Sequence, residues 1–328
     1  MATNTFSSLA GHLRSHNINI PIPTTPQTLL QNPKLAATIA LTISLSIPAL
    51  SYAARSYRGY LALGPGGIPH NVLGWSIQGL LQLVARWDTR DPAPFAEAGN
   101  QRAYEPYGTT SFLELEGLDL GVVEEGVTGE GKGTKGKMEL PQRRGDRPDV
   151  PGYVAPQRQT TQQGTADMRD RMAAYLEDLA ARNPGLLTLK PSGLEGAGGP
   201  LALWLDGTST GTGTGTGDNG NGNGNGNDSS DNVHVQIPPY LRPIRGEIAH
   251  VHPEASSHVT VSMADAGGLV RRGWAERHRL SGVFGVLPWG YVMLYAPRDE
   301  AELGVWRGVV AAGVRFVCAG TGRGVVVV

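Results

Sequence analysis

The sequence has a single cysteine, few aromatic residues and almost no net charge, and each scarcity excludes a class of protein. One cysteine, Cys318, excludes an intramolecular disulfide framework. The 28 basic and 29 acidic residues leave a formal charge of −1. The chain thus lacks the excess of positive charge typical of nucleic-acid-binding proteins, and we expect no nucleic-acid partner. Aromatic residues make up only 6%, and many of the 46 glycines lie in segments that cannot form a core. We therefore expect one folded domain of ordinary size plus a membrane-proximal part.

Charge is absent altogether from residues 35–54. A helix of this length measures roughly 30 Å, which matches the hydrocarbon core of a bilayer. Lys34 precedes it, and Arg55 and Arg58 follow. We expect a single-pass transmembrane helix with the lipid bilayer as partner, in an endomembrane such as the endoplasmic reticulum. A buried soluble helix is the alternative, because Pro48 and five Ser/Thr residues weaken the hydrophobicity.

A second stretch, residues 59–85, also lacks charged side chains. The run Gly64–Gly67 interrupts it. Beyond this break, Trp75, Gln78 and Gln82 predict an amphipathic helix that lies at the membrane interface. A core helix of the soluble domain is the alternative.

Composition divides the chain into segments. They are an N-terminal tail (1–34), the transmembrane helix (35–54), a membrane-proximal region (55–120), a charged flexible segment (121–150), and a domain (151–328) with a disordered Gly/Thr/Asn insertion at 207–232.

The hydrophobic periodicity of the domain predicts helices at 167–182, 265–272 and 298–312, and strands at 186–190, 201–205, 246–252, 258–262, 291–295 and 314–317. Strands that are mostly adjacent in sequence, with helices between them, predict an α+β fold with helices packed on a largely antiparallel sheet.

Three of the eight histidines, His250, His252 and His258, fall within nine residues. Alternation along a strand puts His250 and His252 on one face and Glu247 on the opposite face. Imidazoles titrate near neutral pH, move protons and bind metals, so the run predicts a functional site. Three histidines also suffice in number for a catalytic metal, with His278 as an alternative third ligand.

The order of several short motifs resembles the luciferase domain of fungal luciferases, enzymes of luminous mushrooms that act on 3-hydroxyhispidin. The motifs are Glu247 to His252, His258, Gly273 to His278, Ser281-Gly282 and Tyr295 to Glu300. The likeness extends upstream to Leu140-Pro141, Arg143, Gly145, Arg147-Pro148 and Pro156 to Thr160, and to Tyr57 to Leu61 with Gly64-Pro65 after the apolar run. The chain departs from the luminous enzymes in its two insertions and in Arg279, which follows the last histidine where those enzymes have proline.

The resemblance implies an oxygenase-like enzyme that adds O₂ to a planar aromatic or pyrone-type small molecule without a bound cofactor. The substrate's enol must lose a proton, and a histidine with a pKa near the working pH is a suitable base. We expect His250 or His252 as the base, and His258 and His278 as orienting or proton-relay groups. Arg277 and Glu247 are expected to support them.

Trp274 is expected to stack on the substrate, with a place in the core as its structural alternative. Two other interpretations of the histidine run remain open. One is a metal-dependent enzyme that uses His250, His252 and His258 as ligands. The other is a non-catalytic, membrane-associated binding module whose histidines are structural.

Overall fold

The computed structural model describes residues 32–115, 140–196, 198–207 and 235–327. The chain divides into two units, Met1–Arg58 and Gly59–Val328. Apart from Gly207, the predicted insertion at 207–232 lies outside the described residues, as does most of the charged segment at 121–150.

The N-terminal unit contains most of α3 (Pro33–Ala62), a helix of 30 residues. It covers the segment 35–54 that the sequence predicted as a transmembrane helix. Among the described residues, it is the helix long and apolar enough to cross a membrane, and the apolar window that meets this test is 0% buried.

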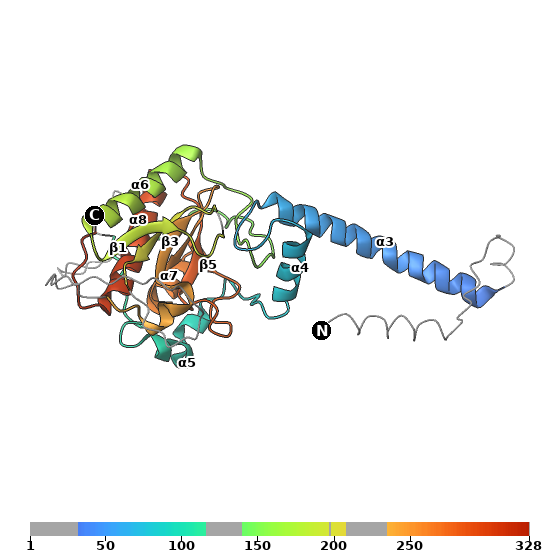
Figure 1. Cartoon of the computed structure of the whole chain (residues 1–328), viewed down its shortest axis with the longest axis horizontal. Helices are drawn as coiled ribbons and strands as arrows, with labels where there is room; N and C mark the ends of the chain where they lie inside the picture. Colours follow the sequence, from blue (N-terminus) through green and yellow to red (C-terminus); the bar gives the residue numbers. More distant parts are fainter. Residues whose placement is uncertain (1–31, 116–139, 197, 208–234, 328) are drawn as a thin grey trace, which may run out of the picture. The chain divides into compact units, whose positions relative to one another are not determined.

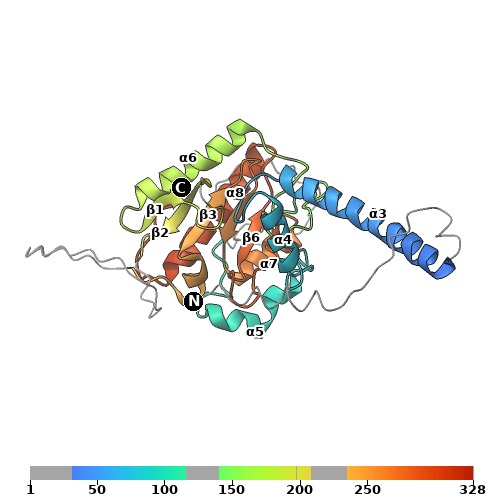
Figure 2. The same ribbon diagram turned by 45° about the vertical axis from the view of Figure 1, so that its right-hand side comes forward.

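The C-terminal unit is built on a six-stranded sheet with the order β1-β2-β3-β4-β6-β5 (Figures 1 and 2). The strands are β1 (Leu187–Pro191), β2 (Leu201–Leu205), β3 (Glu247–Val251), β4 (Ser257–Thr260), β5 (Ala275–Arg277) and β6 (Tyr291–Leu294). All neighbouring strands pair antiparallel. The predicted α+β fold with an antiparallel sheet is confirmed.

Two long helices pack on the sheet. The first, α6 (Ala166–Arg182), contacts β1 and β2, and α8 (Glu300–Ala319) contacts β3, β4 and α6. Each begins where a side chain satisfies free backbone amides: Thr165 accepts a hydrogen bond from Met168 N, and Asp299 accepts one from Glu302 N. Their apolar faces supply much of the core.

Shorter helices complete the unit. They are α4 (Val72–Leu81), η1 (Ala93–Ala96), α5 (Ala98–Gln101), η2 (Arg102–Tyr104), η3 (Pro239–Ile244) and α7 (Met263–Arg271). Helix α7 contacts η1 and β5.

Helix α4 turns its glutamines toward the protein and its apolar side chains toward solvent, the reverse of a helix on a soluble core. Gln78 is buried and its Oε1 accepts a hydrogen bond from Val154 N at 3.1 Å, while Gln82 donates to Gly152 O at 2.8 Å. The glutamines thus face the protein, and apolar side chains point outward. The exposed apolar residues of α4 and the turn after it are Val72, Leu73, Leu80, Leu83, Val84 and Trp87.

Two predictions about the domain need correction. Residues 314–317 belong to α8, not to a last strand: the apolar spacing of 300–319 continues as one helix through Gly313, and no proline interrupts it. Strand β5 was not predicted; it is three residues long and carries charged side chains, which hide it from a hydrophobic pattern.

Candidate functional site

The three clustered histidines occupy neighbouring positions on β3 and β4. His250 and His258 face each other in the antiparallel register, and His252 follows two residues after His250. The opposite face of β4 carries Ser257, whose Oγ accepts a hydrogen bond at 2.8 Å from Trp306 Nε1 of α8. Since side chains alternate along a strand, the histidines point away from α8.

Glu247 lies on the histidine face, so the prediction that it points away from His250 is wrong. Ala249 is opposite Leu203, but Glu247 is opposite Trp204, so β3 has an extra residue at this point. Such a bulge reverses the alternation of side chains. Glu247 Oε1 therefore accepts a hydrogen bond from His250 Nδ1 at 2.6 Å.

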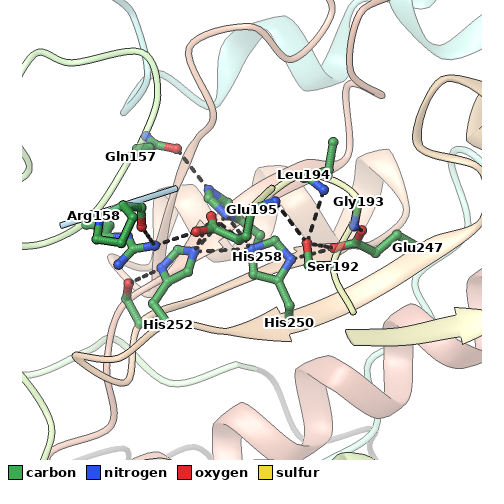
Figure 3. A network of polar contacts seen from close by, with 12 residues as sticks. Gln157, Arg158, Ser192, Gly193, Leu194, Glu195, Glu247, His250, His252 and His258 are labelled. Carbon is green, nitrogen blue, oxygen red and sulfur yellow. Dashed lines mark hydrogen bonds and ion pairs between the residues drawn. The ribbon is translucent and has the colours of Figure 1, made fainter. Parts of the chain in front are cut away.

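Four atoms able to bind a cation converge in a histidine–glutamate cluster made of Glu195, His250, His252 and His258 (Figure 3). All four lie within 4.8 Å of one another. The Nε2 atoms of His250 and His252 are 3.2 Å apart, and His258 Nδ1 is 3.3 Å and 3.1 Å from them. Glu195 Oε1, from the loop after β1, is 3.5 Å from each of those Nε2 atoms.

The other ring nitrogen of His250 is held by the carboxylate of Glu247. This carboxylate also accepts hydrogen bonds from Ser192 Oγ at 2.8 Å and from Gly193 N at 3.0 Å. A carboxylate can only accept hydrogen bonds, and this one accepts from three donors. Nδ1 of His250 therefore carries the proton, and its Nε2 lone pair points into the cluster.

His252 and His258 are oriented in the same way. Ser256 donates its hydroxyl to Glu254 at 2.6 Å, so it accepts from His252 Nδ1 at 2.8 Å. The amide N–H of Gln157 donates a hydrogen bond to Glu276 Oε1 on β5 at 3.1 Å. The Oε1 of Gln157 therefore faces His258 and accepts a hydrogen bond from its Nε2 at 3.3 Å. The remaining nitrogen of each ring presents a lone pair to the cluster.

Negative charge dominates the immediate surroundings. Glu195 and Glu247 contact cluster histidines directly, and Glu254 Oε1 lies 3.4 Å from His252 Nδ1. In the described part of the chain, the guanidinium paired with these carboxylates is that of Arg158, through Glu195. Three carboxylates against a single guanidinium leave two negative charges that a protonated histidine or a bound cation would have to compensate.

The pKa values within the cluster diverge. Burial lowers the pKa of His250, but hydrogen bonds to Glu195 and Glu247 outweigh it and raise the value to about 9. Burial and repulsion by the neighbouring imidazoles hold the pKa of His258 well below its usual range. Burial lowers the pKa of the adjacent His278 to about 3. The carboxylates thus favour positive charge at His250, either as a second proton on Nε2 or as a cation bound there, whereas burial disfavours a charge on His258 and His278.

A cavity of about 730 Å³ lies next to the cluster. Glu195 and Glu254 line it, together with Arg158, which donates Nη2 to Glu195 and to Pro65 O at 3.0 Å. The rest of the wall is mixed: it includes the polar residues Gln159, Thr160, Gln163 and Arg169 and the apolar residues Leu63, Val251, Pro200 and Pro253. Glu195 therefore touches both the cavity and the imidazoles, which are almost fully buried.

His278 lies beside the cluster without completing it. Its ring centroid is 5.3 Å from that of His258 and 5.7 Å from that of Tyr291. Its Nδ1 accepts a hydrogen bond from Leu280 N at 3.1 Å. The structure thus brings four of the predicted residues, His250, His252, His258 and Glu247, into one network, with His278 packed against it.

The structure does not bring Arg277 or Trp274 into this network. Arg277 Nη2 donates to Asp88 Oδ1 at 2.5 Å, and the guanidinium lies 4.8 Å from the centroid of the Trp289 ring. Trp274 is part of the hydrophobic core and donates Nε1 to Pro141 O at 2.7 Å. Trp274 therefore occupies a place in the core, which was the structural alternative to stacking on a substrate.

Glu195, Arg158 and Gln157 belong to the site but were not predicted as site residues. Glu195 is the one acidic residue in the glycine-rich stretch 193–199, which is a weak signal by itself. Gln157 and Arg158 fall in the Pro156 to Thr160 motif that carried part of the family resemblance. That motif was the available signal, although nothing in it indicates contact with the histidines.

The fold and the site define an α+β domain with a buried histidine–carboxylate centre beside a cavity. Residues 245–313, which include His250, His252 and His258, match a family model described as "Luciferase domain". The chain is 24% identical to a luciferase of Armillaria mellea over 88% of its own length and 90% of that protein.

A luciferase of Armillaria gallica is 24% identical over 86% of the chain and 87% of that protein. One of Neonothopanus nambi is 33% identical over 24% of the chain and 30% of that protein. No solved structure matches the chain significantly. Residues 245–313 are thus similar to a luciferase domain, and the predicted resemblance to the fungal luciferases is confirmed.

Proposed function

We propose that the protein is an oxygenase-like enzyme that acts on a planar, electron-rich hydroxypyrone or related aromatic molecule with O₂ as co-substrate. One observation carries this proposal: the similarity to luciferases spans most of the chain, and the matched domain contains the histidine cluster. The cavity beside the cluster has the size of a small-molecule site, which is about 300–1,000 Å³.

In this proposal the cluster is the reaction centre and the cavity holds the substrate. The enol of such a substrate has to become an anion before it reacts with O₂. Arg158 supplies positive charge at the cavity wall, where an enolate oxygen would be stabilised. The free lone pairs of His250 and His252 face each other and Glu195. We therefore propose that the cluster as a whole, rather than a single histidine acting as the base, activates the substrate.

We expect the purified full chain to consume O₂ and emit light when 3-hydroxyhispidin is added, and His252→Ala to lose both signals. The matched control is His70→Gln, because His70 is an exposed histidine outside the cluster. O₂ uptake without light would keep the oxygenase and reject luminescence. Equal O₂ uptake in the wild type and His252→Ala would refute the placement of the reaction centre. Folded protein that consumes no O₂ with this or related hydroxypyrones would favour the binding-module alternative.

We also propose that α3 spans a bilayer once and anchors the enzyme in an endomembrane such as the endoplasmic reticulum. The apolar side chains of α3 are exposed, with Leu41, Leu45 and Leu50 at 60%, 65% and 69%. The outward apolar residues of α4 support the same proposal, because a helix with this pattern suits the membrane interface.

Lysines in the middle of α3 test the anchor. We expect Ile43→Lys/Leu45→Lys to release the protein from membranes in alkaline carbonate, since each lysine at a helix centre costs about 2.5–3.5 kcal/mol. The wild type and Leu201→Lys, which changes an exposed apolar residue of β2, should stay in the membrane pellet. Release of the wild type, or a mature N-terminus located after α3, would contradict a membrane anchor.

A further inference from the structure

The distances within the histidine–glutamate cluster are those of a metal coordination sphere. A tetrahedral site with metal–ligand bonds of about 2.0–2.1 Å has ligand–ligand edges of about 3.3 Å. The three nitrogen–nitrogen distances are 3.1, 3.2 and 3.3 Å, and two nitrogen–oxygen distances are 3.5 Å. The remaining pair, Glu195 and His258, lies within 4.8 Å. The three imidazoles therefore already have the spacing of metal ligands, and Glu195 completes the site by a shift toward His258.

The hydrogen bonds around the cluster leave four acceptors facing one another. His250, His252 and His258 each donate their outer N–H to a partner outside the cluster, and Glu195 is a carboxylate. Lone pairs this close repel, and either a proton on one ring or a metal ion among the four atoms relieves this repulsion. Outer partners that fix the tautomer and the orientation of each ring are typical of metal-binding histidines.

The charge around the cluster also supports a bound cation. With the three imidazoles neutral, as metal ligands are, two negative charges remain after Arg158 is counted against Glu195, Glu247 and Glu254. Burial of uncompensated charge is costly, and a divalent cation would neutralise this excess.

We propose that Glu195, His250, His252 and His258 bind a divalent first-row transition-metal ion, with Glu247, Ser256 and Gln157 as positioning residues. Three imidazoles and a carboxylate suit zinc, iron, copper, nickel or manganese, and disfavour calcium and magnesium. This metal site does not depend on the substrate or the oxygenase activity proposed above.

Elemental analysis of the full chain, purified in detergent with a tag that contains no histidine, tests the proposal. We expect about one transition-metal ion per chain in the wild type and in the control His70→Gln, and loss of most of it in His252→Ala. Addition of Co²⁺ to stripped protein should give the visible absorption of four-coordinate cobalt. Neither measurement requires turnover, so failure of the metal site and failure of the proposed function are distinguishable.

A positioning variant guards against the case in which ligand variants do not fold. Glu247→Gln keeps all four ligand atoms, and we expect it to weaken the affinity for the ion by about 10–100-fold in competition with a chromogenic chelator. Folded wild type that contains no stoichiometric metal and binds no Zn²⁺, Fe²⁺, Mn²⁺ or Cu²⁺ would overturn the proposal. Unchanged affinity in both Glu247→Gln and a folded Glu195→Gln would overturn it as well.

Discussion

Removal of the bound metal ion with a chelator is expected to lower the melting temperature of the C-terminal unit by about 8–16 °C. An ion that binds only the folded state stabilises it by about 4 kcal/mol when its free concentration is 1,000 times its Kd. For domains of 150–250 residues, 1 kcal/mol corresponds to about 2–4 °C. The ligands come from β3, β4 and the loop after β1, so the ion holds three segments together.

Scanning calorimetry of the detergent-purified chain, with and without dipicolinate, measures this effect. Re-addition of the ion should restore the original melting temperature. His252→Ala is expected to melt at the same temperature with and without the chelator, because it has no ion to lose. A wild-type melting temperature that does not respond to the chelator, in protein shown to lose its metal, would contradict a stabilising role for the ion.

The fold was largely predictable because its elements have regular periodicity. Helix α6 has apolar residues at helical spacing and ends at Asn183-Pro184-Gly185, and most of the strands that follow it are short apolar runs. The prediction of secondary structure failed where the local sequence pattern indicates one element and the tertiary structure forms another. Residues 314–317 read as a short β-branched run, but α8 buries them as its last full turn.

The site was predictable only in part, for two physical reasons. His250, His252 and His258 are close in sequence and on paired strands, so a local pattern could find them. Glu195 reaches the cluster through the antiparallel register of β1, β2 and β3, which spacing in sequence does not encode. The bulge at Glu247 follows Gly246, but a glycine at the start of a strand does not by itself indicate an extra residue, so alternation placed that carboxylate on the wrong face.

Arg277 shows how a residue from the same motif can serve the fold instead. Its side chain is 0% exposed and its Nε and Nη1 atoms have no hydrogen-bond partner, so the ion pair with Asp88 is its main compensation. It lies over the Trp289 ring rather than near the histidines. The His278 position next to it faces the cluster because successive residues of a strand point to opposite faces.

Asp88→Asn is therefore expected to destabilise the C-terminal unit by about 2–3 kcal/mol. Loss of one partner from a buried ion pair costs about 3–5 kcal/mol, and partial exposure of Asp88 reduces this cost. The hydrogen bond from Arg86 lowers the pKa of Asp88 to about 2 against the opposing effect of burial, and Arg277 contributes to the lowering. A lowered pKa means that this stabilisation is complete above the unfolded-state value of about 4 and is lost as the pH falls toward the folded-state value.

Chemical denaturation at a series of pH values tests both parts of this prediction. The wild type should lose stability between these two pKa values more steeply than Asp88→Asn, whose side chain does not titrate. The double variant Asp88→Asn/Arg277→Met should recover part of the stability lost in Asp88→Asn, because it removes the buried charge along with its partner and keeps an apolar side chain over Trp289. A double variant less stable than Asp88→Asn alone would show that the guanidinium is held by more than this ion pair, and equal pH slopes would show that Asp88 titrates normally.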